Sequence, residues 1–150
     1  MSEYAELARD RGVRRASVLA WLRLARVYQK LQRAASGHLR AWNLSMAQFD
    51  ALAQTGSREG LTQQELADRL LVTKGNISQL LDRMEQAGLI RRQQEGRTCR
   101  IHLTEPGRQL FAEVVPRHEA FIAGLFDAVP CREQHQLLAH LRTLDHALDG

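Results

Sequence analysis

The stretch of residues 61–107 constrains the fold more than any other part of the chain. It starts with TQQE at residues 62–65, which forms a capping box: the Thr62 hydroxyl can accept the backbone N–H of Glu65, and the Glu65 carboxylate can reach back. A second helix-start signal follows at Thr73. Behind it, apolar residues recur at helical spacing at Ile77, Leu80, Leu81 and Met84. The pattern predicts two short amphipathic helices in succession.

Two strand-like pieces follow the second helix, which Gly88 is expected to end in a left-handed conformation. Residues 89–92 are predicted to form one strand, 93–96 the turn and 97–103 the returning strand. Every second residue of the returning strand is apolar, namely Cys99, Ile101 and Leu103. Helix, turn, helix and hairpin in this order predict a winged helix-turn-helix, which places one helix in the major groove of DNA.

The run VTKGNISQLLDRMEQAGLIRR and the closing LTEPG resemble the MarR family of bacterial transcription regulators. The resemblance is close over the central third and looser elsewhere, where length and helix order also fit. It implies a homodimeric repressor, released by a small molecule bound between the dimerisation helices and the DNA-binding lobe, or by a redox signal. It also implies that Glu95 orients Arg97. Leu71, where such turns often have Gly, and EGR at 95–97, in place of an Asp-Arg-Arg type run, depart from the family pattern.

The segments on either side of this stretch are predicted to be helical. Residues 13–42 form one amphipathic pattern that Asn43 can terminate. A capping box at residues 45–48 starts a helix that runs to about Thr55, before a loop at residues 56–60.

Two more helices are predicted at the C-terminal end. One starts at Thr104 and contains Pro116, which predicts a kink. The other follows a break at Val129-Pro130 and is rich in leucine. The predicted fold is mainly α with a small β-hairpin wing, in a single MarR-like domain. Its winged helix-turn-helix lobe, residues 44–103, is flanked by dimerisation helices in residues 1–43 and 104–150.

Charge is distributed unevenly along the 150 residues, whose formal net charge is +4. Residues 1–42 carry +6, residues 43–108 carry +1 and residues 109–150 carry −3. The opposite charges of the two ends favour their association in a homodimer. The nearly neutral middle supports an alternative function, a winged-helix module for protein–protein contact without DNA binding.

The candidate DNA contacts are polar and basic side chains of the two helices and the hairpin. Asn76 and Gln79 suit paired hydrogen bonds to adenine, and Lys74 suits guanine or a phosphate. Arg97 at the hairpin tip is expected to enter the minor groove. The full predicted set is Gln63, Gln64, Thr73, Lys74, Gly75, Asn76, Ser78, Gln79, Arg83, Arg91, Arg92 and Arg97. The predicted partner is double-stranded DNA with a pseudo-palindromic operator, whose half-sites lie about 10 bp apart.

No motif for catalysis or nucleotide binding occurs, so an enzyme, which would be thiol- or metal-dependent, is the weakest alternative. No cofactor or metal is predicted, although three histidines of the C-terminal helices leave open a site in a dimer. Cys131, at a predicted helix start, is the candidate redox residue, whereas Cys99 is expected to pack under the wing. No apolar run approaches the ~20 residues of a membrane span, and the N-terminus lacks a signal-peptide core, which predicts a cytoplasmic protein with no membrane partner.

Overall fold

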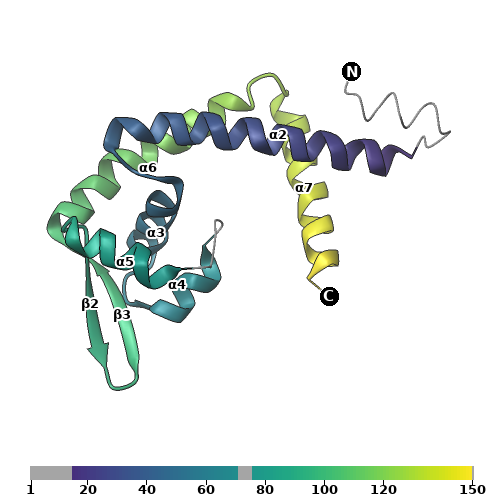
Figure 1. Ribbon diagram of the computed structural model, residues 1–150. Coiled ribbons are helices and arrows are strands. Elements are labelled where there is room, and N and C mark those ends of the chain that lie inside the picture. The colour runs from purple at the N-terminus through teal and green to yellow at the C-terminus, as the bar shows by residue number, and fades with distance from the viewer. Residues whose placement is uncertain (1–14, 71–75, 150) are drawn as a thin grey trace. The chain divides into compact units, whose positions relative to one another are not determined.

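The computed structural model describes residues 15–70 and 76–149 (Figure 1). The chain divides into two compact units, residues 1–37 and residues 38–150. Helix α2 (Ala16–Leu39) supplies most of the described part of the first unit and extends two residues into the second. No helix of the described residues is long and apolar enough to cross a membrane.

The long N-terminal α-helix ends at Leu39, three residues earlier than predicted. The 3-10 helix η1 (Arg40–Trp42) follows α2, and Asn43 then adopts a left-handed conformation with φ of 55°. Its backbone N–H donates to the carbonyl of Arg40 at 3.0 Å. Asparagine reaches this region more readily than most residues because its side chain is short and polar. The prediction of Asn43 as terminator is confirmed.

Helix α3 (Met46–Ser57) begins with the predicted capping box. The Ser45 hydroxyl accepts the backbone N–H of Gln48 at 3.1 Å, and the Gln48 side chain accepts the N–H of Ser45 at 2.9 Å. The helix is two residues longer than predicted, so Gly56 lies inside it rather than in a loop. A Cβ at Gly56 would lie 2.3 Å from the ring of Phe111, so glycine here allows close packing.

The sheet has three strands, β1 (Leu61–Thr62), β2 (Ile90–Glu95) and β3 (Thr98–Leu103), in the antiparallel order β1-β3-β2. Only two strands were expected, because a strand of two residues carries no periodic signal. The predicted turn at residues 93–96 was wrong: Gln93 to Glu95 pair with β3, and the turn is only Gly96-Arg97. Gly96 has φ of 61°, which suits a two-residue hairpin turn.

The core of the second unit joins helices α4 (Gln63–Arg69) and α5 (Ile77–Gln86) to the sheet. Its fully buried side chains include Leu66 of α4, Leu81 and Met84 of α5, and Ile101 of β3. These positions carry the helical and alternating patterns predicted from the sequence. The core therefore holds α5 and the base of the hairpin on one rigid support.

Helix α6 (Glu105–Leu125) begins as predicted, with the Thr104 hydroxyl accepting the N–H of Gly107 at 3.1 Å. It continues through Pro116. Helix α7 (Cys131–Leu148) follows Pro130, as predicted, and has no buried residue. Its exposed leucines are Leu137, Leu138, Leu141, Leu144 and Leu148.

Candidate nucleic-acid interface

A polar side chain caps each of the two helices that make up the predicted helix-turn-helix. Thr62 Oγ1 accepts the N–H of Glu65 at 3.1 Å, and Glu65 Oε1 accepts the N–H of Thr62 at 3.4 Å, which confirms the predicted box. Hydrogen bonding of the Glu65 carboxylate, first with the side chain and then with the backbone N–H of Thr62, holds the pKa of Glu65 below its ordinary value. Asn76 caps α5, and its Oδ1 accepts the N–H of Gln79 at 3.2 Å. The predicted cap at Thr73 lies outside the described residues. Its prediction of the helix start was wrong, because α5 begins at Ile77 and Asn76, expected inside the helix, is its cap.

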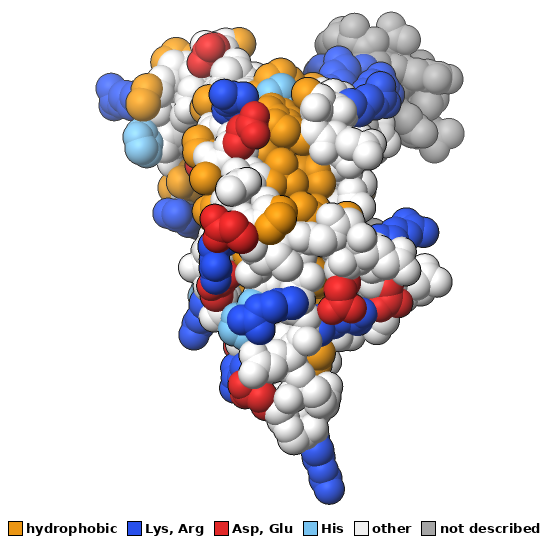
Figure 2. All heavy atoms as spheres, turned by 90° about the vertical axis from the view of Figure 1, so that its left-hand side faces the viewer, with side chains coloured by type: hydrophobic (Ala, Val, Ile, Leu, Met, Phe, Trp, Pro, Cys, Tyr) orange, Lys and Arg blue, Asp and Glu red, His pale blue; other side chains and the backbone are white. Residues whose placement is uncertain are grey.

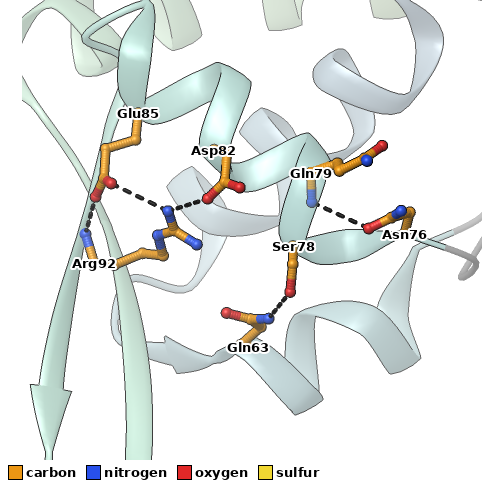
Figure 3. Close-up of polar contacts among 7 residues, drawn as sticks. All are labelled: Gln63, Asn76, Ser78, Gln79, Asp82, Glu85 and Arg92. Carbon is orange, nitrogen blue, oxygen red and sulfur yellow. Dashed lines mark hydrogen bonds and ion pairs between the residues drawn. The ribbon is translucent and has the colours of Figure 1, made fainter.

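The first turn of α5 presents exposed polar side chains (Figure 3). Ser78 Oγ accepts a hydrogen bond from Nε2 of Gln63 at 3.0 Å, which joins α5 to α4. Within the described part of the chain, the side-chain amide of Gln79 and the NH₂ group of Asn76 make no hydrogen bond. The first turn of α5 can therefore offer amide donors to a ligand, while its backbone remains capped.

Three of the predicted contacts, Thr73, Lys74 and Gly75, lie outside the described residues. Gln64 is exposed near the start of α4, and its Nε2 donates to Oδ1 of Asp68 at 3.3 Å. That contact lies within one exposed helix face, so Gln64 can exchange it for another partner at little cost.

Arg83 of α5 and Arg97 of the hairpin turn are exposed cations. Neither has a hydrogen bond or an ion pair among the described residues. Arg91 in β2 is also exposed, and its Nη1 donates to Oε1 of Gln93 at 3.3 Å. Uncommitted guanidinium groups can neutralise an anionic partner without first breaking an ion pair.

Arg92, also predicted to contact DNA, is engaged within the protein. Its Nη2 donates to Oε1 of Glu85 at 3.1 Å and forms an ion pair with Asp82 (Figure 3). The backbone N–H of Arg92 donates to Oε2 of Glu85 at 3.2 Å. The hydrogen bonds that Arg92 donates, first to Glu85 and then to Asp82, raise the pKa of Arg92, and Arg92 in turn lowers the pKa of Glu85. A direct contact of Arg92 with DNA would compete with both carboxylates.

Strand alternation distinguishes Arg92 from Arg91. Arg92 shares one face of β2 with the buried Ile90, whereas Arg91 and Gln93 lie on the other, exposed face. The two-residue period of the strand was therefore the sequence signal that could have identified Arg92 as facing α5.

Sequence reasoning missed Arg100 of β3. Its Nε donates to Oε2 of Glu95 at 2.8 Å, and its Nη1 donates to the carbonyl of Gly60 at 2.8 Å. The resemblance had implied that Glu95 orients Arg97, but Glu95 is paired with Arg100 instead. The contact arises because residues 95 and 100 lie near each other across the short turn, a register that a longer turn would have shifted.

The surface around the hairpin carries both signs of charge. In Figure 2, basic and acidic side chains are interspersed over the lower half of the view, and one basic side chain projects from the hairpin end. This agrees with the net charge of +1 for residues 43–108. Arg92 carries one positive charge against the two carboxylates of Asp82 and Glu85, so this cluster has a net charge of −1. Arg83, Arg91 and Arg97 form no ion pair among the described residues.

The cysteines and the histidines are not among the predicted DNA contacts. Cys131 is exposed at the first residue of α7, and Cys99 is half-buried against the core, as predicted for Cys99. In the described ranges, no three His, Cys, Asp or Glu side chains are grouped so that they could hold a metal ion. His38 and His118 contact each other, with 2.9 Å between their Nδ1 atoms, inside a group of aromatic rings.

A family model described as "MarR family" matches residues 42–100 of this chain. A helix-turn-helix-type transcriptional regulator of Bacillus cereus, itself uncharacterised, is 38% identical over 128 residues, which are 85% of this chain and 87% of that protein. The chain belongs to the MarR family. Its family and relatives are transcriptional regulators rather than enzymes.

Two more similarities agree with the same assignment, and a third shows the same fold. The regulator PecS of Dickeya dadantii is 31% identical over 101 residues, which are 63% of this chain and 61% of PecS. The crystal structure of AbsC, a MarR family regulator of Streptomyces coelicolor, superposes with a TM-score of 0.80 and 26% identity over 88% of this chain and 93% of AbsC. The Staphylococcus aureus MepR–DNA complex shares the fold, with a TM-score of 0.75 and 24% identity over 87% of this chain and 97% of MepR.

Proposed function

We propose that this MarR-family chain is a homodimeric regulator that reads double-stranded DNA by sequence. The observation that carries the proposal is the arrangement on α5 and the hairpin. Amide groups of Asn76 and Gln79 are exposed at the first turn of α5, and Arg83 and Arg97 are exposed cations without partners among the described residues. Amides suit base edges in the major groove, and free cations suit phosphates.

Each helix-turn-helix reader of this kind places the N-terminal residues of its second helix against base edges. In this chain that helix is α5, and the hairpin tip extends beyond the core beside it (Figure 1). Arg97 at the tip would enter the adjacent minor groove, and Gln63 and Gln64 of α4 would contact phosphates. Lys74, Thr73 and Gly75 belong to the proposed contact by the family resemblance of their sequence.

The homodimer is proposed because α7 exposes a row of leucines. Leu137, Leu138, Leu141 and Leu144 are 38–49% exposed and recur at helical spacing. A second copy of the chain would remove this apolar surface from water. Two copies related by a two-fold axis would read an inverted repeat whose half-sites lie about 10 bp apart. The dimer would act as a repressor in the cytoplasm.

The test is binding of the purified protein to duplex DNA, measured by fluorescence anisotropy over a range of salt concentrations. Asn76→Ala and Gln79→Ala should each relax base preference at one position, with a loss of about 1–3 kcal/mol of discrimination. Arg97→Ala should weaken binding to all sequences and reduce the salt slope by about 1. Arg117→Ala is the matched control, because Arg117 lies on α6, paired with Glu113.

Unchanged affinity and base preference in all three interface variants would contradict the proposed placement of α5 and the hairpin tip on DNA. Failure of the wild-type protein to bind duplex DNA at any salt concentration would favour the alternative, a winged-helix module that binds protein.

We also propose that a redox signal releases the protein from DNA and that Cys131 is the sensor, since its exposed side chain is accessible to an oxidant. Hydrogen peroxide should weaken DNA binding by the wild-type protein and leave Cys131→Ser unaffected. An equal loss of binding in both proteins would exclude Cys131 as the sensor and indicate another oxidisable side chain, such as Cys99. No response in either protein would leave a small molecule as the signal.

A further inference from the structure

On strand β2 the hairpin leaves the core at Arg92, and the β2 residues from there to the tip are exposed. In β2, Ile90 is buried and Arg92 half-buried, but Gln93, Gln94 and Glu95 are all exposed. The outer half of β2 therefore buries no side chain, and besides backbone pairing it has only contacts with exposed or half-buried groups, such as the ion pair between Glu95 and Arg100. Side chains at the base of the hairpin must therefore set its direction. A two-stranded hairpin without a packed face is only marginally stable by itself.

Two arginines fix that base from opposite sides. On β3, Arg100 donates to the carbonyl of Gly60 at 2.8 Å. On β2, Arg92 joins Asp82 and Glu85 of α5 (Figure 3). Arg92 thus adds a polar link between the hairpin and α5, the helix proposed to read bases, to the core packing of Ile90 and Ile101.

The geometry of Arg92 favours a link within the protein over a contact with a ligand. Its side chain is 22% exposed, against 53% for Asp82 and 43% for Glu85. Glu85 receives hydrogen bonds from both the guanidinium and the backbone N–H of Arg92, at 3.1 and 3.2 Å. Glu85 of α5 therefore holds both the side chain and the main chain of Arg92 in β2.

We propose that Arg92 is a positioning residue, which holds the hairpin at a fixed distance and angle from α5 so that Arg97 and the first turn of α5 contact the same stretch of DNA. The inference rests on the proposed function. It differs from the sequence prediction for Arg92, which was a direct contact with DNA.

The two roles differ in how Arg92 and Arg97 depend on each other. A phosphate ligand at position 92 would add its own contact, so its loss would leave the contribution of Arg97 unchanged. If Arg92 positions the hairpin, the contribution of Arg97 to binding would depend on the presence of Arg92. Residues that act through one arrangement show non-additive effects, whereas independent contacts add.

The experiment is a double-mutant cycle of Arg92→Gln and Arg97→Ala, measured as affinity for a duplex that the wild-type protein binds. We expect Arg97→Ala to weaken binding at least about threefold less in the Arg92→Gln background than in the wild-type background. Arg91→Gln is the matched control, since it removes the same charge from the adjacent, exposed position of β2. Its cycle with Arg97→Ala should be additive. Additivity in both cycles would overturn the inference.

Loss of Arg92 also uncovers the charges of Asp82 and Glu85, which would repel phosphates. The triple variant Asp82→Asn, Glu85→Gln, Arg92→Gln removes that repulsion and leaves the hairpin unlinked. We expect the contribution of Arg97 to stay reduced in this background. Its full recovery would show that the role of Arg92 is charge compensation and would overturn the positioning role.

Hydrogen exchange without DNA separates this inference from the proposed function. Arg92→Gln should speed exchange of the hairpin amides of β2 and β3 several-fold, and Arg91→Gln should not, because only Arg92 is bonded to α5. Faster exchange in a protein that binds no duplex would refute the proposed function but support the link. Exchange unchanged by Arg92→Gln would contradict the link itself. Arg92→Lys, which restores one ion pair, should recover part of both effects.

Discussion

In the winged lobe the apolar side chains are buried against one another, whereas in α7 they are exposed to solvent. Leu66, Leu81 and Ile101 of the lobe are completely buried, but Leu138 and Leu144 of α7 are 45% and 49% exposed. The difference indicates that one copy of the chain completes the lobe but does not complete the surroundings of α7. Binding of DNA and association with a second copy should therefore be separable by mutation.

The largest expected effect is on the lobe core. Leu81→Ala should lower the free energy of unfolding by about 2–5 kcal/mol, because it leaves a cavity at a fully buried position. Leu141→Ala is the matched change in α7, where the side chain is 38% exposed, and should cost less than about 0.5 kcal/mol in dilute protein. Urea unfolding at low concentration measures both. Equal losses would contradict the contrast between the two regions.

The second effect is on association. Replacing Leu137 and Leu141 together by serine should raise the dimer dissociation constant at least about a hundredfold. The change removes from each dimer four leucines that the proposed interface would bury. Sedimentation equilibrium measures the constant, with Gln136→Ser as the control on the same helix. The circular dichroism of the double variant should match that of the wild-type protein. A dimer as tight as the wild-type one would show that α7 is not at the interface.

A smaller effect is expected at the start of α4. Thr62→Ala should cost about 1 kcal/mol of folding stability, because it removes the hydroxyl that accepts the backbone N–H of Glu65 at the helix start. Thr62→Ser keeps the hydroxyl and should restore most of the loss. Thermal unfolding compares the stability of the three proteins. An alanine variant as stable as the wild-type protein would show that the Thr62 cap does not stabilise the fold.

The smallest effect at neutral pH concerns His118. Burial, and then the charge of His38, lower the pKa of His118 below its ordinary value of 6.5. The unfolded chain therefore binds a proton more readily than the folded one, and stability is complete above about pH 6.5 and is lost as the pH falls towards the folded pKa. The other charged groups on these elements include Arg40, the buried Asp50, and Arg117, which is paired with Glu113.

Urea unfolding between pH 7.5 and pH 5 measures this dependence. His118→Gln should reduce the loss of stability on acidification, and His38→Gln should reduce it by less, because burial of His118 is the larger cause. A loss that is the same in all three proteins would assign the pH dependence to other groups.

The elements with local signals were predictable from the sequence. The caps at Ser45, Thr62 and Thr104 were found because each requires only a hydroxyl and its neighbours in the chain. Strand β1 and the short turn Gly96-Arg97 were missed, because pairing with a distant strand decides them. Long-range register was not visible in the local pattern.

The candidate site shows the same limit. The exposed residues Gln79, Arg83 and Arg97 were selected by their positions on a helix or a turn. The partners of Arg92 and Arg100 were not found, since each contact joins segments that only the folded chain brings together. The sequence predicted which side chains face outwards better than which of them are already bound within the protein.

Selection of randomised duplex DNA by the wild-type protein and by the Leu137→Ser, Leu141→Ser variant tests most directly that a dimer places two copies of α5 in successive major grooves. Such a dimer should select an inverted repeat with one-turn spacing. The variant should select a single half-site and bind it more weakly. No enriched sequence for the wild-type protein, at low or physiological salt, would contradict this placement of α5.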